Sequence, residues 1–213
     1  MSPPAIRFRP LRREDLPMIH AWLNRPHVAE WWDDRLSLEQ VIEDFGPMAD
    51  GTDSTRGYIV CLGDEEIGFL QCYVVAGSGG GFWSDEVDPG ARGTDQFLAR
   101  EDLLGKGLGT AMLRAFVDQL FEDPSITKVQ VDPSPSNERA IRAYRKAGFE
   151  PGPVVETPDG PARLMVCRRA ERERSRAASA SAASPSPARP DGSSELPGEL
   201  AAAEADVHLG DEG

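Results

Sequence analysis

A glycine-rich stretch from Leu103 to Thr110 is the part of the sequence most suited to holding a ligand. Glycine occupies Gly105, Gly107 and Gly109, and an amphipathic helical pattern follows directly. Glycine lets the backbone approach a ligand and adopt dihedral angles that a Cβ atom would block, and the unpaired N–H groups at a helix start attract anions. The stretch therefore predicts a phosphate-binding turn, although a glycine-rich turn without a ligand is also an open interpretation.

The glycine spacing does not match two common phosphate motifs. The Walker pattern needs Gly-Lys-Ser/Thr after four intervening residues, and a dinucleotide turn needs Gly-x-Gly-x-x-Gly. Neither pattern occurs at this turn.

A carboxylate and a phenol close to this turn could move protons. Asp95 lies in the short apolar segment from Thr94 to Leu98, and Tyr144 lies in a predicted helix that follows Asn137. Acyl transfer to a primary amine with a pKa of about 10.4 requires a site that binds the ammonium and removes a proton, which a carboxylate can do. A tyrosine hydroxyl can donate a proton to a leaving group. A surface or helix-capping aspartate and a core tyrosine are the alternatives.

The charge of the chain is strongly negative, at −13. Residues 1–169 contain 19 Lys and Arg against 27 Asp and Glu, a net −8, and residues 170–213 contain 4 against 9, a net −5. Such a surface disfavours nucleic acid and attracts polycations, although excess carboxylates often serve only to solvate a surface.

The sequence predicts neither a membrane protein nor a metal protein. No apolar run approaches the roughly 20 residues of a membrane span, and Met1 to Pro4 lacks a signal-peptide pattern, so we expect a cytoplasmic location. Cys61, Cys72 and Cys167 lie in apolar segments without Cys-x-x-Cys spacing, which predicts buried free thiols.

The elements that must position these residues form an alternating α/β pattern. Ser37 with Gln40 predicts a capping box, and Gly148 predicts a helix end. The strand, helix and strand over 94–132 predict a parallel pair joined by a right-handed crossover. Strands are expected at 5–11, 57–62, 67–75, 94–98, 127–132, 154–156 and 162–167, and helices at 15–23, 37–45, 107–122 and 136–147.

Three connecting or terminal segments complete the organisation. Residues 27–34 read as a connection with an aromatic pair, and residues 76–83 as a glycine-rich loop that could cover a substrate. Residues 5–169 are expected to form one domain. Residues 170–213, rich in Ala, Ser, Pro, Gly and Glu, are expected to be disordered, with a short helix or partner motif at 196–207 as the alternative.

The sequence resembles the GCN5-related (GNAT) N-acetyltransferases, and within them the aminoglycoside 6′-N-acetyltransferases. The superfamily turn is Gln/Arg-x-x-Gly-x-Gly/Ala before a helix; this chain departs from it at Leu104, as does the closer subgroup. The resemblance covers about residues 6–169 and implies an α/β (α+β) fold with a mixed central sheet flanked by helices. Its motifs are His27 to Trp32, Asp88 to Gly90, Arg92 to Leu98, Leu104 to Gly109, Asp132 to Asn137 and Thr157 to Ala162.

The resemblance also implies roles for individual residues. It gives Asp95 the general-base or amine-orienting role and Tyr144 the role of proton donor to the sulfur of acetyl-CoA. Acetyl-CoA would then be the cosubstrate, with no metal. Its expected contacts are Gln96, Phe97 and Leu98 through their backbone, together with Gly105, Lys106, Gly107, Leu108, Gly109, Thr110 and Asn137.

The implied second substrate is a polycationic aminosugar, acetylated at its 6′-amine. Relatives commonly carry an acidic residue where Gly80 stands, so this chain has one carboxylate fewer in that loop, and the substrate range stays open. We expect no nucleic-acid or membrane partner, and a monomer or weak homodimer. The expected substrate contacts are Trp32, Asp53, Tyr73, Ser78, Trp83, Asp95, Asp132 and Asp159.

Two other functions fit the sequence. The first is an N-acyltransferase for a lysine-like or siderophore-precursor amine, since relatives with a similar segment at His27 to Trp32 have that activity. The second is a sensor that binds aminoglycoside without turnover; loss of the glycines, Asp95 or Tyr144 would favour it, and all of them are present.

Overall fold

A mixed seven-stranded sheet forms the centre of the protein, which we describe from a computed structural model covering residues 5–32, 36–77, 83 and 85–183. The strand order is β1-β2-β3-β4-β5-β7-β6. The strands are β1 (Ile6–Pro10), β2 (Arg56–Leu62), β3 (Glu65–Val74), β4 (Ala91–Leu98), β5 (Lys128–Val131), β6 (Glu150–Thr157) and β7 (Gly160–Arg168).

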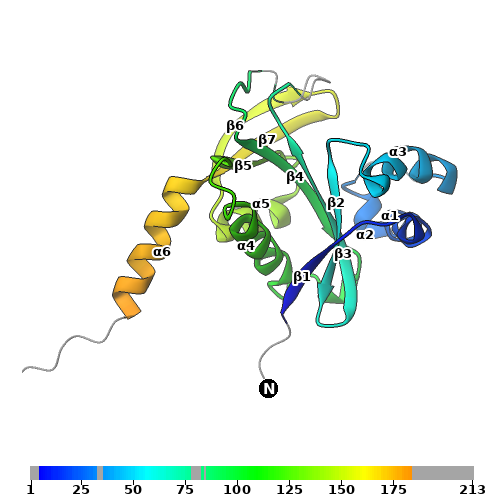
Figure 1. Cartoon of the computed structure of the whole chain (residues 1–213), viewed down its shortest axis with the longest axis horizontal. Coiled ribbons are helices and arrows are strands. Elements are labelled where there is room, and N and C mark those ends of the chain that lie inside the picture. Colours follow the sequence, from blue (N-terminus) through cyan, green and yellow to red (C-terminus); the bar gives the residue numbers. More distant parts are fainter. Residues whose placement is uncertain (1–4, 33–35, 78–82, 84, 184–213) are drawn as a thin grey trace, which may run out of the picture.

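Helices cover both faces of this sheet. Figure 1 shows α1, α2 and α3 on one side of it and α4 and α5 on the other. The α-helices are α1 (Leu16–Leu23), α2 (Pro26–Ala29), α3 (Leu38–Asp50), α4 (Leu108–Leu120), α5 (Glu138–Ala147) and α6 (Arg169–Ala183), with short 3-10 helices η1 (Arg13–Asp15) and η2 (Glu101–Leu103).

Alternation along the strands divides the core between these two layers. On β4, Phe97 packs with the α1 and α3 side while its neighbour Leu98 packs with Met112 and Phe116 of α4. On β3, Phe69 and Leu70 divide in the same way. This period of two is what a strand covered on both faces produces. The predicted fold class is thereby confirmed.

The parallel contact between β4 and β5 is short, and this opens the sheet. β5 pairs with β4 only over Ala91 to Gly93, whereas β3 pairs with β4 as far as Leu98. β5 ends at Val131, and beyond it the Pro133 carbonyl accepts from Arg163 N–H of β7 at 2.9 Å, so this segment follows β7 and not β4. Across the described residues, the edge of β4 from Thr94 onward therefore lacks a partner strand on this side.

Several local predictions are confirmed. Ser37 and Gln40 form the capping box of α3, Gly148 ends α5 with φ of 101°, and the β6–β7 hairpin turns at Pro158 and Asp159, between the paired Thr157 and Gly160. The three cysteines are free and buried.

Two predictions about irregular segments are wrong in part. Pro26–Ala29 forms α2, a one-turn helix started by Pro26 at a position where a missing N–H costs little. Residues 170–183, expected to be disordered, belong to α6. Alanine-rich composition favours this helix, and spaced Arg and Glu side chains add ion pairs along it.

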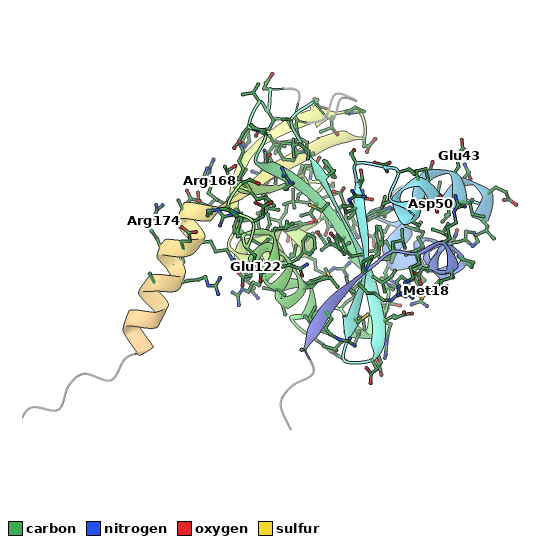
Figure 2. The ribbon with its side chains drawn as sticks, viewed as in Figure 1. Met18, Glu43, Asp50, Glu122, Arg168 and Arg174 are labelled. Carbon is green, nitrogen blue, oxygen red and sulfur yellow. The ribbon has the colours of Figure 1, made fainter. Side chains whose placement is uncertain are left out.

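Two arginines at the start of α6 attach it to the domain. Arg169 donates to the carbonyls of Phe121 and Ile126 at 2.6 and 2.8 Å. Arg172 donates to the Asp118 carboxylate at 2.6 Å and to the carbonyl of Ala147 at 2.8 Å. Figure 2 shows Arg168 at the junction of β7 and α6, and Arg174 further out on the helix.

Candidate active site

A cavity of about 820 Å³ lies where β4 and β5 separate. Its walls come from the end of β4, the start of α4, the inward face of α5, the segment after β5 and the β6–β7 turn. Most of the predicted site residues line it: Trp32, Asp95, Gln96, Phe97, Leu98, Gly105, Gly107, Gly109, Thr110, Asp132, Asn137, Tyr144 and Asp159.

The glycine turn has the geometry of an anion site. Gly105 and Gly107 have φ of 73° and 82°, and a Cβ atom at either would meet nothing within 4 Å. The turn is therefore left-handed and open on the ligand side. The first hydrogen bond of α4 runs from Ala111 N–H to the Gly107 carbonyl, so the N–H groups of Leu108, Gly109 and Thr110 precede it.

Two predicted residues of the turn do not line the cavity. Lys106 is exposed, and Leu108 packs its side chain against the core with Leu104. A contact from Leu108 to a ligand would therefore use its backbone.

The basic face of α5 extends the anion site. Arg139, Arg142 and Lys146 line the cavity from this helix, and Asn137 caps its start by accepting from Ala140 N–H at 3.0 Å. Sequence reasoning missed the three basic residues as ligands. Their spacing of three and four is the helical period, which is a signal that could have identified them.

Carboxylates gather at the other end of the cavity. Gln71, which sequence reasoning also missed, donates from Nε2 to Asp95 Oδ2 at 3.0 Å. Burial raises the pKa of Asp95, and the negative charge of Asp159 raises it further, while the Gln71 hydrogen bond opposes both. Burial and then the Asp95 charge raise the pKa of Asp132 to about 6. A ligand that removes this mutual repulsion must be cationic.

Tyr144 reaches the cavity from α5. Its hydroxyl accepts a hydrogen bond from Gln96 Nε2 across to β4. Burial, and then the charge of Asp95, raise the pKa of Tyr144, so the phenol keeps its proton at neutral pH. A protonated phenol and a basic carboxylate thus face one cavity.

Two adjacent tryptophans have different environments. Trp32 packs edge-on against Phe97 and Phe69, with ring centroids 5.0 and 5.9 Å apart, and presents one side to the cavity. Trp31, which was not predicted as a site residue, also lines the cavity and is exposed.

Three of the remaining predicted contacts, Asp53, Tyr73 and Trp83, do not line the cavity. The carboxylate of Asp53 accepts from Thr55 N–H at 2.7 Å, which ties it into the turn before β2. Tyr73 packs over Gly93 and lies near enough for Asp95 and Asp132 to raise its pKa, although burial is the larger cause. Trp83 has a φ of 51°. Ser78 and Gly80 fall outside the described residues.

The cavity is therefore lined by a left-handed glycine turn, by basic side chains of α5, and by Asp95, Asp132, Asp159 and Tyr144. Within the described residues, no group of three His, Cys, Asp or Glu side chains could hold a metal ion. A search of the same residues finds no helix long and apolar enough to cross a membrane.

The fold and the site define an acetyltransferase domain of the GNAT class. A family model described as "Acetyltransferase (GNAT) domain" matches residues 12–157. "Aminoglycoside N(6′)-acetyltransferase type 1" of Klebsiella pneumoniae is 51% identical over 168 residues, which cover 78% of this chain and 84% of that protein. "Kanamycin resistance protein" of Rhizobium radiobacter is 61% identical over 90 residues, 42% of this chain and 83% of that protein.

Comparison with solved structures indicates the same family. The crystal structure of AAC(6′)-Ib with coenzyme A and kanamycin superimposes with a TM-score of 0.77 at 51% identity, covering 81% of this chain and 99% of that chain. This chain therefore belongs to the GNAT acetyltransferases and, within them, to the family of the aminoglycoside N(6′)-acetyltransferases.

Proposed function

We propose that this protein transfers the acetyl group of acetyl-CoA to the 6′-amine of aminoglycoside antibiotics, and so confers resistance to them. The observation that carries the proposal is the division of one cavity into a cationic end, at the glycine turn and α5, and an anionic end, at Asp95, Asp132 and Asp159. An anionic cofactor and a polycationic sugar would meet there. The relatives at 51% identity are enzymes of this kind by name.

Acetyl-CoA fits the residues present. The left-handed glycines leave the turn open, and the N–H groups of Leu108 to Thr110 suit a pyrophosphate. Within the described residues, no strand pairs with the outer edge of β4 at Gln96 to Leu98, so its backbone could meet an extended ligand, apart from the Leu98 carbonyl, which lies 3.1 Å from His27 Nε2. Arg139, Arg142 and Lys146 would balance further phosphate charge. When bound, acetyl-CoA supplies an acetyl group activated as a thioester.

Asp95 would bind the ammonium group and accept its proton. Its raised pKa makes the carboxylate a stronger base than an exposed aspartate, closer to the pH at which it works. Gln71 fixes one carboxylate oxygen and leaves the other for the amine. Tyr144 would give its proton to the departing sulfur.

Asp132 and Asp159 would hold the other ammonium groups of the sugar. Trp32 and Trp31 would supply apolar surface beside it. Asp53, Tyr73, Ser78 and Trp83 stay predicted substrate contacts, and Lys106 a predicted cofactor contact.

Release of free thiol from acetyl-CoA tests this function. We expect turnover with kanamycin, and none above background with free lysine or without an acceptor. Turnover with lysine and not with kanamycin would favour a siderophore-precursor acyltransferase. Kanamycin binding without thiol release would favour a sensor.

The partners and location follow from the same reasoning. With excess negative charge and a small-molecule cavity, we expect a cytoplasmic enzyme that binds no nucleic acid or membrane and is a monomer or weak homodimer. Sedimentation velocity at micromolar concentration would measure the oligomeric state.

A further inference from the structure

The side chain of Gln96 contacts one of the two proton-transfer groups of the cavity. Gln96 follows Asp95 on β4, and its Nε2 donates to the hydroxyl of Tyr144 on α5. Its other amide atom, Oε1, lies 3.5 Å from the hydroxyl oxygen of Thr94. That hydroxyl also donates to the Gln71 carbonyl at 2.8 Å, which anchors it in the sheet.

The direction of the contact decides what the phenol can do. An amide N–H can only donate, so the oxygen of Tyr144 must accept from Gln96 through a lone pair. The single hydrogen of the hydroxyl is then left for another acceptor. Among the described residues, Tyr144 has no second hydrogen-bond partner, and its side chain lines the cavity.

We propose that Gln96 is a positioning residue that holds the hydroxyl of Tyr144 as a proton donor directed into the cavity. This inference rests on the proposed function, in which Tyr144 protonates the departing sulfur. The same N–H would also stabilise the tyrosinate left after that step, because hydrogen bonds to charged groups are stronger than those to neutral ones. It opposes the effects of burial and of Asp95 on the phenol.

The proton balance of the reaction makes this contact useful. As the C–N bond forms and the C–S bond breaks, the electron pair of the C–S bond stays on sulfur, which takes the proton of Tyr144. The amine nitrogen loses two protons overall. One passes through Asp95 to water, and the other, through water, restores Tyr144.

Two substitutions at Gln96 separate its roles. Gln96→Leu removes the donor and should lower kcat about tenfold or more, with KM for acetyl-CoA nearly unchanged because the backbone of β4 is kept. Gln96→Glu replaces the donor by an acceptor, which would take the hydrogen of Tyr144, and should lower kcat as far as Tyr144→Phe does. Gln119→Leu makes the matched change at an exposed position of α4 and should have no effect.

A double-mutant cycle distinguishes positioning from a purely structural role. If Gln96 acts through the phenol, Gln96→Leu should cause no further loss of kcat in a Tyr144→Phe background. Equal losses in both backgrounds, or unchanged kcat in Gln96→Leu and Gln96→Glu, would overturn the inference.

A measurement without turnover tests the same contact. With 3,5-difluorotyrosine at position 144, fluorine NMR can follow its ionisation at accessible pH. Gln96→Leu should raise the pKa of this phenol by about one unit or more, the equivalent of one hydrogen bond to its anion. An unchanged or lower value contradicts the inference. Wild-type protein that releases no thiol with any amine would contradict the proposed function, and the titration would still decide the role of Gln96.

Discussion

At the scale of single residues, carboxylates in the cavity repel one another, and a cationic substrate would reduce this repulsion. Asp95 and Asp132 both have raised pKa values, each from burial first and from a neighbouring carboxylate second. Binding of ammonium groups would stabilise their charged forms. These side chains are therefore arranged for binding and chemistry at a cost in stability.

The first prediction concerns that cost at Asp132. The folded state raises its pKa to about 6, above the unfolded value, so folding favours the protonated form. The resulting stabilisation is present below the unfolded pKa, near 4, and is lost as pH rises through about 6. At pH 7.5, Asp132→Asn should therefore increase the free energy of unfolding by roughly 1–2 kcal/mol. Thermal melts at pH 7.5 and pH 4 would measure the gain, which should shrink at the lower pH. A lower melting temperature at pH 7.5 would contradict the account.

The second prediction concerns substrate binding by the same residue. In the proposed function Asp132 attracts the sugar mainly by charge, so Asp132→Asn should weaken aminoglycoside binding by an amount that falls as salt rises. In the wild-type protein, affinity should fall as pH drops through about 6, where Asp132 becomes neutral. Calorimetry at two salt concentrations and several pH values would test this. A salt-independent loss would assign Asp132 a structural role instead.

The sequence identified the proposed proton-transfer and substrate residues, but it did not identify the side chains that contact them. Asp95, Asp132 and Tyr144 line one cavity. They could be predicted because each lies in a recognisable motif or near a strand end in the sequence. The contacts of Gln71 and Gln96 depend on which side chains β3 and α5 bring opposite β4, and no single segment contains that information.

At the scale of elements, the glycine turn and the open edge of β4 together would make the cofactor end of the proposed site. Left-handed glycines precede α4, and β5 ends at Val131, before the end of β4. The separation of the two strands then leaves backbone groups of β4 accessible. The anion site is therefore built from backbone, and the α5 side chains extend it.

The third prediction tests this turn. Gly107→Val places a branched side chain at a φ of 82°, in the space open to the ligand, and should raise KM for acetyl-CoA at least tenfold. Gly51→Val is the matched control, since Gly51 has a φ of 72° at the end of α3, away from the cavity. Both variants should lose a similar 1–2 kcal/mol of stability from left-handed strain. Equal KM values in folded Gly107→Val and wild type would move the cofactor site elsewhere.

Strands and long helices were predictable from periodicity, and short or exposed helices were not. α2 is one turn long, which is too short for an apolar pattern. α6 lacks an apolar face, so composition alone favoured disorder, whereas Arg169 and Arg172 attach it by hydrogen bonds to distant carbonyls. Such anchors depend on tertiary structure and leave no periodic signal.

At the scale of the whole molecule, α6 extends the folded part beyond the catalytic domain predicted to end at residue 169. In Figure 1 the helix leaves the body beside α4 and α5. Its Arg172 joins those two helices through Asp118 and the Ala147 carbonyl, behind the side of α5 that lines the cavity. The start of α6 therefore supports the active-site helices.

The fourth prediction measures this support. The Arg172 side chain is 13% exposed, so Arg172→Ala should lower the free energy of unfolding by about 2 kcal/mol, because it removes the hydrogen bonds to Asp118 and to the partly buried carbonyl of Ala147. Arg176→Ala removes an exposed partner of the same Asp118, 68% exposed, and should cost under about 0.5 kcal/mol. Urea unfolding would measure both changes. Equal small losses would mean that α6 contributes nothing to the domain.

Two truncations compare the contribution of α6 with that of the residues after it. Removal of residues 170–213 should lower the melting temperature as Arg172→Ala does, whereas removal of residues 184–213 should leave melting temperature and turnover nearly unchanged. A marked drop in melting temperature or turnover after removal of residues 184–213 would mean that these residues contribute to the folded protein.

The central step of the proposed function is the transfer of the amine's proton to Asp95, beside the cofactor turn. Steady-state kinetics of Asp95→Asn, with kanamycin and acetyl-CoA varied in turn, tests this most directly, since the change keeps the shape and removes the basicity. We predict that kcat falls about a hundredfold or more while the affinity for acetyl-CoA, measured separately by calorimetry, stays at the wild-type value. Turnover of Asp95→Asn at the wild-type rate would contradict the assignment and place the base elsewhere.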